Sequence, residues 1–307
     1  MLTMLMLLVV TLIGVWLQRH NYVSKNTKSL LFKYVYYVAT PCAVIYALIT
    51  RHFNSYSEYG RFLAINSVIY LFIFVVLYSY LKNRKIRFNI AGVIAFCSNA
   101  PNSVFLGFPL ILTFFYNGTF IFAVLLGTIM DAVLNFIRLS LLGKYVKTRN
   151  KSHKHKLLLV KSFVNSFLIA LLIGLGVVYL RLEVSKNLLN LIGHIGQSAT
   201  YTALLMLGIS VGRLKIVKKD YEELTAIALV KLVAMPLMVL IFSLIFNLPE
   251  SAVNAGVFIA AMPTAIFSLI VAGNFKLDEH LAASAVLITT TISTITLPLW
   301  YIILHTI

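Results

Sequence analysis

The chain has 307 residues, of which 60% are hydrophobic and 11% are charged, with a formal net charge of +17 and a mean hydropathy of +0.93. A water-soluble domain carries about 25% charged residues, because it needs a solvated surface. This composition therefore excludes a soluble globular protein and indicates an all-α transmembrane protein. The Lys and Arg residues fall in short runs between apolar stretches, which is typical of membrane loops and not of a nucleic-acid-binding surface.

Apolar stretches long enough to cross a membrane recur along the whole chain. A helix needs about 20 apolar residues to cross a hydrocarbon core of about 30 Å. The sequence therefore predicts ten spanning helices, at 2–17, 29–49, 60–81, 88–116, 118–143, 157–180, 187–211, 223–247, 252–274 and 280–303. The first stretch has neither a basic leader nor a cleavage site, so we expect a spanning helix there and not a signal peptide.

The positive charges test this count independently. If the chain crosses the membrane ten times, the odd-numbered loops share one side and the even-numbered loops share the other. Eighteen Lys and Arg residues fall in the odd-numbered loops and four in the even-numbered loops. Because cytoplasmic loops carry the excess of Lys and Arg, the odd loops are predicted to be cytoplasmic. Both termini of this multi-pass cell-membrane protein are then predicted to be extracytoplasmic.

A basic loop at 144–156 divides the chain into two predicted halves, a first five-span repeat at 1–143 and a second at 157–307. Each half has an odd number of spans, so related halves must be inverted with respect to each other in the membrane. Inverted repeats with broken helices near the membrane midplane are the architecture of many secondary transporters.

Proline-containing interruptions occur in the fourth span of each half, at Pro101 and at Pro263. Proline removes a helix hydrogen bond and clashes with the preceding turn. The freed backbone groups are tolerated at this depth only against protein or a water-filled cavity. The N-terminal ends of broken helices favour an anion, and the C-terminal ends favour a cation. The alternative is that both prolines merely kink packed helices, but their matching positions favour two functional breaks.

Asp131 is the only acidic residue well inside a predicted span. A charge at the bilayer centre costs at least about 2.5–3.5 kcal/mol, so such residues are usually functional or paired. Two hypotheses stay open: a role in proton or cation coupling or in the substrate cavity, and structural pairing with a basic residue such as Lys231 or Lys161. Asn135 shares a helical face with Asp131 and Arg138 and is expected to lie between them.

The other intramembrane cations have simpler expectations. Arg138 and Lys161 are close to the cytoplasmic boundary, so their side chains are expected to reach the interface. Lys231 lies deeper, and it either reaches the interface as well or faces the cavity.

Residues 100–110 read Ala-Pro-Asn-Ser-Val-Phe-Leu-Gly-Phe-Pro-Leu, and residues 261–265 read Ala-Met-Pro-Thr-Ala. The first stretch resembles the Asn-x-x-Phe-x-Gly-x-Pro-Leu signature of the auxin efflux carrier (AEC) family of membrane transporters. That family includes plant PIN auxin exporters and bacterial malate-permease-like proteins. The second stretch, with 272–275 and 278–279, resembles the last two spans of the same family.

The resemblance implies a fold of two inverted five-helix repeats, with a scaffold and a moving domain whose crossed broken helices at spans four and nine bind an organic anion. It also implies which side chains form the site. The residues expected to bind substrate are Asn102, Pro101, Asn99, Pro263 and Thr264, and those expected in coupling or in the cavity are Asp131, Asn135 and Lys231. Neither a cofactor nor a metal is expected, while coupling to protons, to sodium or to the membrane potential alone stays open.

The leading hypothesis is a secondary active transporter for a small organic anion such as a carboxylate, working by elevator-like alternating access. The alternative is a channel-like or sensory membrane protein of the same fold without coupled transport. A membrane enzyme is disfavoured because the chain has no recognisable catalytic motif such as Gly-x-Ser-x-Gly. The expected partners are the substrate and membrane lipid and not nucleic acid, and a homodimer is one of the assemblies left open.

Overall fold

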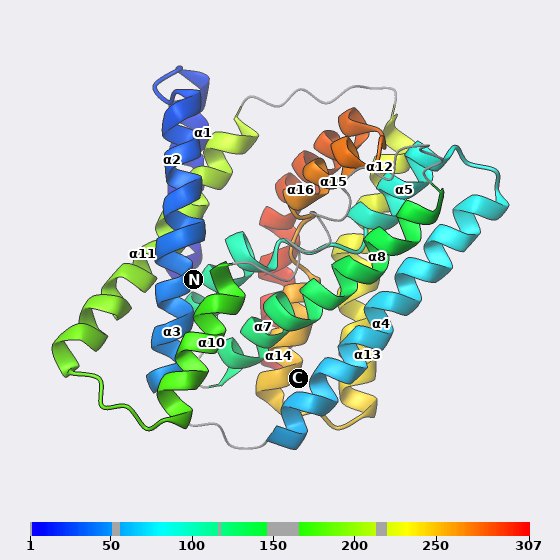
Figure 1. The fold of residues 1–307 in the computed structure, drawn as a ribbon. Coiled ribbons are helices and arrows are strands. Elements are labelled where there is room, and N and C mark those ends of the chain that lie inside the picture. Colours follow the sequence, from blue (N-terminus) through cyan, green and yellow to red (C-terminus); the bar gives the residue numbers. More distant parts are fainter. Residues whose placement is uncertain (1, 51–55, 116–117, 146–165, 213–219) are drawn as a thin grey trace.

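The computed structural model describes residues 2–50, 56–115, 118–145, 166–212 and 220–307. Within these ranges the regular secondary structure is helical, and strand-like pairing is confined to one bridge between Pro101 and Thr264. The predicted all-α class is therefore confirmed for the described part of the chain (Figure 1). The predicted loop at 144–156 lies outside the described residues, except for its first two positions at the end of a helix.

The helices follow one another along the chain, and short π-helical turns, labelled η, continue several of them. Their bounds are α1 Leu2–Arg19, α2 Lys25–Tyr34, η1 Val35–Ala39, α3 Thr40–Thr50, α4 Tyr56–Asn83, α5 Phe88–Cys97, η2 Ser103–Gly107, α6 Phe108–Phe114, α7 Thr119–Leu125, η3 Leu126–Met130, α8 Asp131–Tyr145, α10 Ser166–Tyr179, α11 Lys186–Val211, α12 Tyr221–Leu229, η5 Val230–Ala234, α13 Met235–Ile245, α14 Glu250–Ala260, α15 Phe267–Asn274 and α16 Glu279–Thr306.

Several of these helices have the length and composition of membrane spans. Five described helices are long and apolar enough to cross a membrane: Asn26–Thr50, Ser57–Asn83, Thr119–Gly143, Tyr221–Ile245 and Glu279–Thr306. The predicted spans four and nine are not continuous helices. The first is divided into α5 and η2–α6, and the second into α14 and α15, so the expected interruptions are present.

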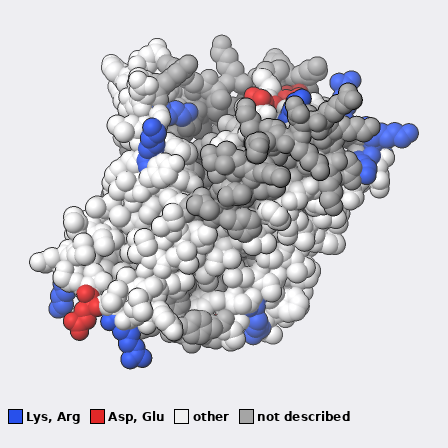
Figure 2. Space-filling view, in the orientation of Figure 1, with Lys and Arg blue, Asp and Glu red and all other residues white. Residues whose placement is uncertain are grey.

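The outer surface has the character expected in lipid. Large apolar side chains are exposed on several helices, among them Trp16, Phe72, Leu172 and Ile295. On the face drawn in Figure 2, the charged residues gather toward the two ends of the molecule, and an uncharged band lies between them. An apolar band between two charged ends matches a bilayer core between two headgroup layers.

The helices form two groups that lie side by side in Figure 1. The peripheral group consists of α1, α2–α3, α10 and α11, in which α1 packs on α11 and α10 packs on α3. The central group consists of α4 to α8 and α12 to α16. The two groups meet where α11 contacts η2 and α6, and where α3 contacts α7.

Helix contacts of the first half recur in the second half. The contact of α1 with α11 is matched by that of α10 with α3, and the contact of α4 with α5 by that of α13 with α14. In the same way, α7 packs on α14 as α5 packs on α16. Helices that occupy corresponding places in the two halves therefore have corresponding neighbours.

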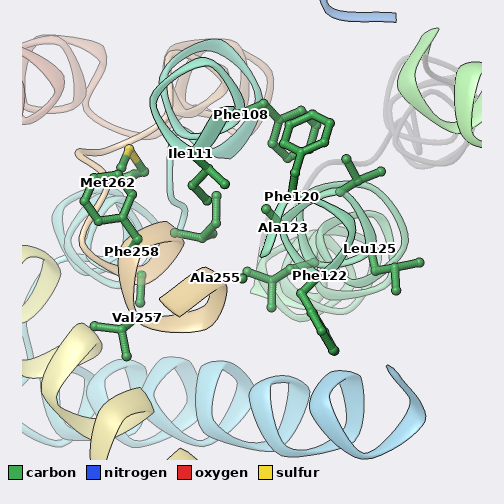
Figure 3. Close-up of a cluster of buried hydrophobic side chains, with 14 of the residues drawn as sticks. Phe108, Ile111, Phe120, Phe122, Ala123, Leu125, Ala255, Val257, Phe258 and Met262 are labelled. Carbon is green, nitrogen blue, oxygen red and sulfur yellow. The ribbon is translucent and has the colours of Figure 1, made fainter. Parts of the chain in front are cut away.

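Aromatic packing holds the half-helices of the central group in place. Figure 3 shows Phe108 of α6 next to Phe120 of α7 on one side of this cluster, Phe258 of α14 next to Met262 on the other side, and Ile111 between them. The rings of Phe108 and Phe120 meet edge to face, with their centroids 5.6 Å apart. Close-packed interiors have low compressibility. This cluster therefore keeps α6 and α14 in a fixed position relative to each other, next to the two breaks.

Within the peripheral group, α1 and α11 approach each other at the level of the backbone. A methyl group added at Gly208 would overlap the carbonyl oxygen of Thr11 and would lie 2.9 Å from the amide nitrogen of Val15. A methyl group added at Gly176 in α10 would meet nothing within 4 Å. Small residues allow such close helix crossings in membranes.

We therefore expect Gly208→Ala to lower the stability of the detergent-solubilised protein by about 1–3 kcal/mol, the usual cost of overpacking. The matched control, Gly176→Ala, is expected to leave stability unchanged or to raise it slightly, because alanine is the better helix former. Thermal unfolding of both variants in one detergent measures the difference. Equal melting temperatures would contradict the close crossing of α1 and α11.

Candidate functional site

The two broken spans cross each other at their breaks. The amide of Asn102 donates to the carbonyl oxygen of Pro263 at 2.8 Å, and the amide of Ala265 donates to that of Ala100 at 2.9 Å. These two bonds flank the antiparallel bridge between Pro101 and Thr264. Neither proline can donate a hydrogen bond. The connector between α5 and η2 and the connector between α14 and α15 therefore pair their free backbone groups with each other. The backbone freed by the two breaks is thus partly satisfied within the crossing.

Thr264 ties the crossing to two further helices. Its hydroxyl donates to the carbonyl oxygen of Cys97 at 2.8 Å, at the end of α5, and its amide donates to the hydroxyl of Thr289 in α16 at 3.1 Å. The Thr264 side chain is fully buried. Its contacts are those of a residue that holds α5, α16 and the second connector together.

Asn99 holds the first connector from the other side. Its side-chain amide donates to the carbonyl oxygen of Tyr70 in α4 at 2.9 Å and contacts the sulfur of Met235 at 3.6 Å. Its carbonyl oxygen accepts a hydrogen bond from Arg138. Asn99 is therefore engaged on three sides by the central group.

Two buried cations occupy the carbonyl ends of the half-helices. Arg138 donates through Nη2 to the carbonyl oxygen of Asn99 at 3.2 Å, just beyond α5. Lys231 donates through Nζ to the carbonyl oxygen of Ala260 at 2.6 Å, the last residue of α14. Both side chains are 0% exposed. A cation at a helix C-terminus compensates the negative end of the helix dipole.

This arrangement corrects the expectation for Arg138. Instead of reaching the membrane interface, its guanidinium turns inward, because the carbonyl oxygen of Asn99 and the side chain of Asn135 accept its hydrogen bonds there. Its Nη1 donates to Oδ1 of Asn135 at 3.1 Å, so Asn135 contacts Arg138, as their shared helical face predicts. Lys231 is likewise buried and does not extend to the interface.

A pocket of about 150 Å³ opens beside the crossing, between the peripheral and central groups. Tyr36 of η1 and Phe167 of α10 line it from the peripheral group, and Phe105 and Phe267 line it from the central group. Its polar wall comes from the central group. That wall consists of Asn102, Ser103, Thr128, Asp131 and Asn135.

The N-terminal ends of two half-helices face this pocket. Ser103, Val104 and Phe105 begin the continuous helix η2–α6, Ile266 is the N-cap residue of α15 and Phe267 begins α15; all five residues line the pocket. The first-turn amides of a helix have no acceptor within that helix. Converging helix N-termini favour a negatively charged ligand.

The pocket also contains a carboxylate. Oδ2 of Asp131 accepts a hydrogen bond from the hydroxyl of Ser103 at 3.0 Å. Among the described residues, the ion pair found within 4.0 Å is that of His280 with Asp220, so Lys231 does not pair directly with Asp131. Lys161, the other basic residue considered for that role, lies outside the described ranges.

The predicted site residues thus fall into two sets. Pro101, Asn102, Asp131 and Asn135 line the pocket. The other four, Asn99, Pro263, Thr264 and Lys231, are not among its lining residues and form the hydrogen-bonded framework of the crossing. The substrate and coupling roles of all eight stay predictions.

Several pocket residues were missed by sequence reasoning. Ser103 stands next to Asn102 in the quoted motif, and its hydroxyl beside a predicted break was a usable signal. Tyr36, Phe167 and Phe105 gave no such signal, because an aromatic residue in an apolar span has the same appearance whether it faces lipid or a pocket.

Comparison with known proteins agrees with this membrane architecture. Residues 1–301 match the family described as "Membrane transport protein". A protein of Methanocaldococcus jannaschii named an uncharacterized transporter is 26% identical over 307 aligned residues, covering 96% of each chain. Another uncharacterized transporter, from Methanothermobacter thermautotrophicus, is 22% identical over 98% of this chain and 97% of its own length. The chain therefore belongs to the membrane transport protein family, the auxin efflux carrier family that its motifs resemble.

Proposed function

We propose that the protein is a secondary active transporter of a small organic anion such as a carboxylate. The observation that carries this proposal is the pocket at the crossing, where two half-helix N-termini converge. Free amides and the positive ends of two helix dipoles are suited to a carboxylate group. Membership of a transporter family favours transport over membrane-bound catalysis.

The proposed mechanism is elevator-like alternating access. The pocket lies between two groups of helices, and the amide, carboxyl, Ser and Thr side chains of its wall all belong to the central group. A bound anion would therefore travel with the central group as it slides along the peripheral group. The close backbone crossing of α1 and α11 makes the peripheral group a suitable fixed scaffold.

The proposed membrane topology is ten spans arranged as two inverted repeats. The recurrence of the same helix contacts in both halves supports this arrangement. The broken fourth span of each half supports it as well, because each break meets the other at the crossing. The charge asymmetry of the loops supports cytoplasmic odd loops and extracytoplasmic termini.

With that orientation, the proposed opening of the pocket is toward the cytoplasm. Its residues on the fifth span, from Gly127 to Asn135, lead toward the basic end of α8. Its residues at the start of α15 lead toward the basic position Lys276. The described conformation would then be the inward-facing state of the cycle.

Uptake of labelled mono- and dicarboxylates into proteoliposomes, with and without imposed proton, sodium and voltage gradients, tests the proposed function. Saturable uptake of at least one carboxylate is expected. Unsaturable flux without any gradient dependence would favour a channel-like protein instead. No flux of any tested carboxylate would contradict the proposal that the pocket carries a small carboxylate.

Asn102→Ala is expected to weaken the apparent affinity for that carboxylate about tenfold or more. Asn102 lines the pocket, and a hydrogen bond to a charged group contributes about 1.5–3 kcal/mol. The control is Asn190→Ala on the exposed face of α11, which should keep the native KM. An unchanged KM in Asn102→Ala would remove Asn102 from the binding site.

A further inference from the structure

One hydroxyl group stands between the pocket carboxylate and the half-helix N-terminus. Ser103 is the first residue of η2 and is 2% exposed. Its Oγ lies 3.0 Å from Oδ2 of Asp131 and 3.4 Å from the carbonyl oxygen of Pro101. A serine hydroxyl carries one proton and two acceptor lone pairs. Ser103 can therefore donate to Asp131 or to a substrate anion, but not fully to both.

A substrate anion at this N-terminus would meet an unfavourable neighbour. The carboxylate of Asp131 lines the same pocket as the first-turn amides of η2. Two negative charges in one site repel each other, and one of them is relieved when it takes up a proton. The substrate is held at the helix N-terminus as an anion. Asp131 is therefore the group that takes up the proton and loses its charge.

The surrounding charged groups make Asp131 the exchangeable one. Arg138 and Lys231 both act on it electrostatically, but each is engaged with a half-helix carbonyl and is fixed in place. The phenol groups that face this region are Tyr70 of α4, which Asp131 also affects, and Tyr36 of η1 in the pocket wall. Neither phenol is a carboxyl group that could take up the proton in place of Asp131.

We propose that Ser103 and Asp131 couple the uptake of one proton to the binding of each substrate anion, so that the protein is a proton–anion symporter. This inference rests on the proposed function. It names the coupling ion and assigns Ser103 as the group that connects proton and substrate.

The exchange involves only O–H groups. In the empty pocket, the Ser103 hydroxyl donates to the Asp131 carboxylate. On loading, Asp131 takes up one solvated proton from the aqueous side, which leaves neutral water, and then donates a hydrogen bond to Oγ of Ser103. The Ser103 hydroxyl keeps its proton and donates a hydrogen bond to the substrate carboxylate. One negative and one positive charge enter together, and both leave when the pocket opens to the other side.

The experiment uses the full-length protein in proteoliposomes that contain a trapped pH-sensitive dye. The probe is the labelled carboxylate with the largest saturable uptake among lactate, succinate and malate, after uptake by protein-free liposomes is subtracted. For a monoanion, each unit of pH gradient is expected to support about tenfold accumulation. The dye should report one proton per anion.

Two substitutions separate coupling from binding. Asp131→Asn mimics the protonated side chain, so it is expected to lose gradient-driven accumulation and to retain exchange of external label for internal unlabelled anion. Ser103→Ala is expected to lose accumulation as well, and Ser103→Thr should restore it because the hydroxyl returns. Ser243→Ala, at a buried serine of α13 away from the pocket, is the matched control and should accumulate as the native protein does.

The outcomes are distinguishable. Saturable uptake by the native protein without proton movement would overturn the inference and leave the proposed function standing. Accumulation driven by the pH gradient in Asp131→Asn would also overturn it. If Asp131→Asn loses exchange too, Ser103→Ala decides, because exchange without accumulation in that variant supports the coupling and full accumulation refutes it. Absence of any carboxylate uptake would be a failure of the proposed function itself.

Discussion

Lys231→Met is expected to lower carboxylate uptake about thirtyfold at subsaturating substrate, while the protein still inserts into the membrane. Methionine fills a similar volume, but it provides neither a donor for the carbonyl oxygen of Ala260 nor a positive charge. A hydrogen bond from a charged group contributes about 1.5–3 kcal/mol. The loss of this bond frees the end of α14, directly before the connector that carries Pro263.

The charge of Lys231 has a second effect. This positive charge acts on Asp131 in the pocket wall and also favours an anion bound in the same pocket. Lys231→Arg keeps the charge and a donor, so it should recover much of the uptake. Lys231→Met therefore tests charge and donor together, and Lys231→Arg tests the shape of the donor alone.

Arg61→Met is the matched control for Lys231→Met. Arg61 donates to the carbonyl oxygen of Phe246 at 2.6 Å, at the end of α13, but this contact is exposed. Water can replace an exposed donor, and surface interactions of this kind contribute little. Uptake by Arg61→Met should therefore be close to native. Native KM and kcat in Lys231→Met would contradict a role of the buried cation at the crossing.

The positions of the two breaks could be predicted from the sequence, but their contact could not. Pro101 and Pro263 mark the interruptions because proline cannot continue a helix. The pairing of Asn102 with Pro263 joins segments from opposite halves of the chain. That pairing depends on how all the surrounding helices pack, which no local pattern encodes.

The residues around Asp131 were likewise predictable from the sequence only where they lie on the same helix. Asn135 was correctly expected next to Arg138, because helical periodicity relates residues three and four positions apart. The inward turn of Arg138 was not expected, because its acceptor is the carbonyl oxygen of Asn99 on another helix. The aromatic wall from Tyr36 and Phe167 depends in the same way on how the peripheral group faces the crossing.

Arg138→Lys is expected to abolish most of the transport although it keeps the positive charge. Arginine presents several donors in a rigid fork, whereas lysine carries one flexible ammonium group. The native fork bonds the Asn99 carbonyl and the Asn135 side chain at once, and its guanidinium lies 6.0 Å from the centroid of the Tyr70 ring. The three donors of lysine radiate from a single nitrogen, so they do not reproduce two bonds made by two separate nitrogens, and a poorly satisfied buried acceptor costs about 1–3 kcal/mol.

A double-mutant cycle of Arg138→Lys with Asn135→Ala identifies the acceptor that matters. If Arg138 acts mainly through Asn135, adding Asn135→Ala to Arg138→Lys should cost little more than Arg138→Lys alone, because contacting residues are not additive. If it acts mainly by holding the end of α5 at Asn99, the two losses in uptake should add. Both variants need comparable thermal unfolding in detergent for this comparison. Native uptake in Arg138→Lys would mean that a positive charge alone suffices at the crossing. Transport would then not require the two separate donors of the guanidinium group.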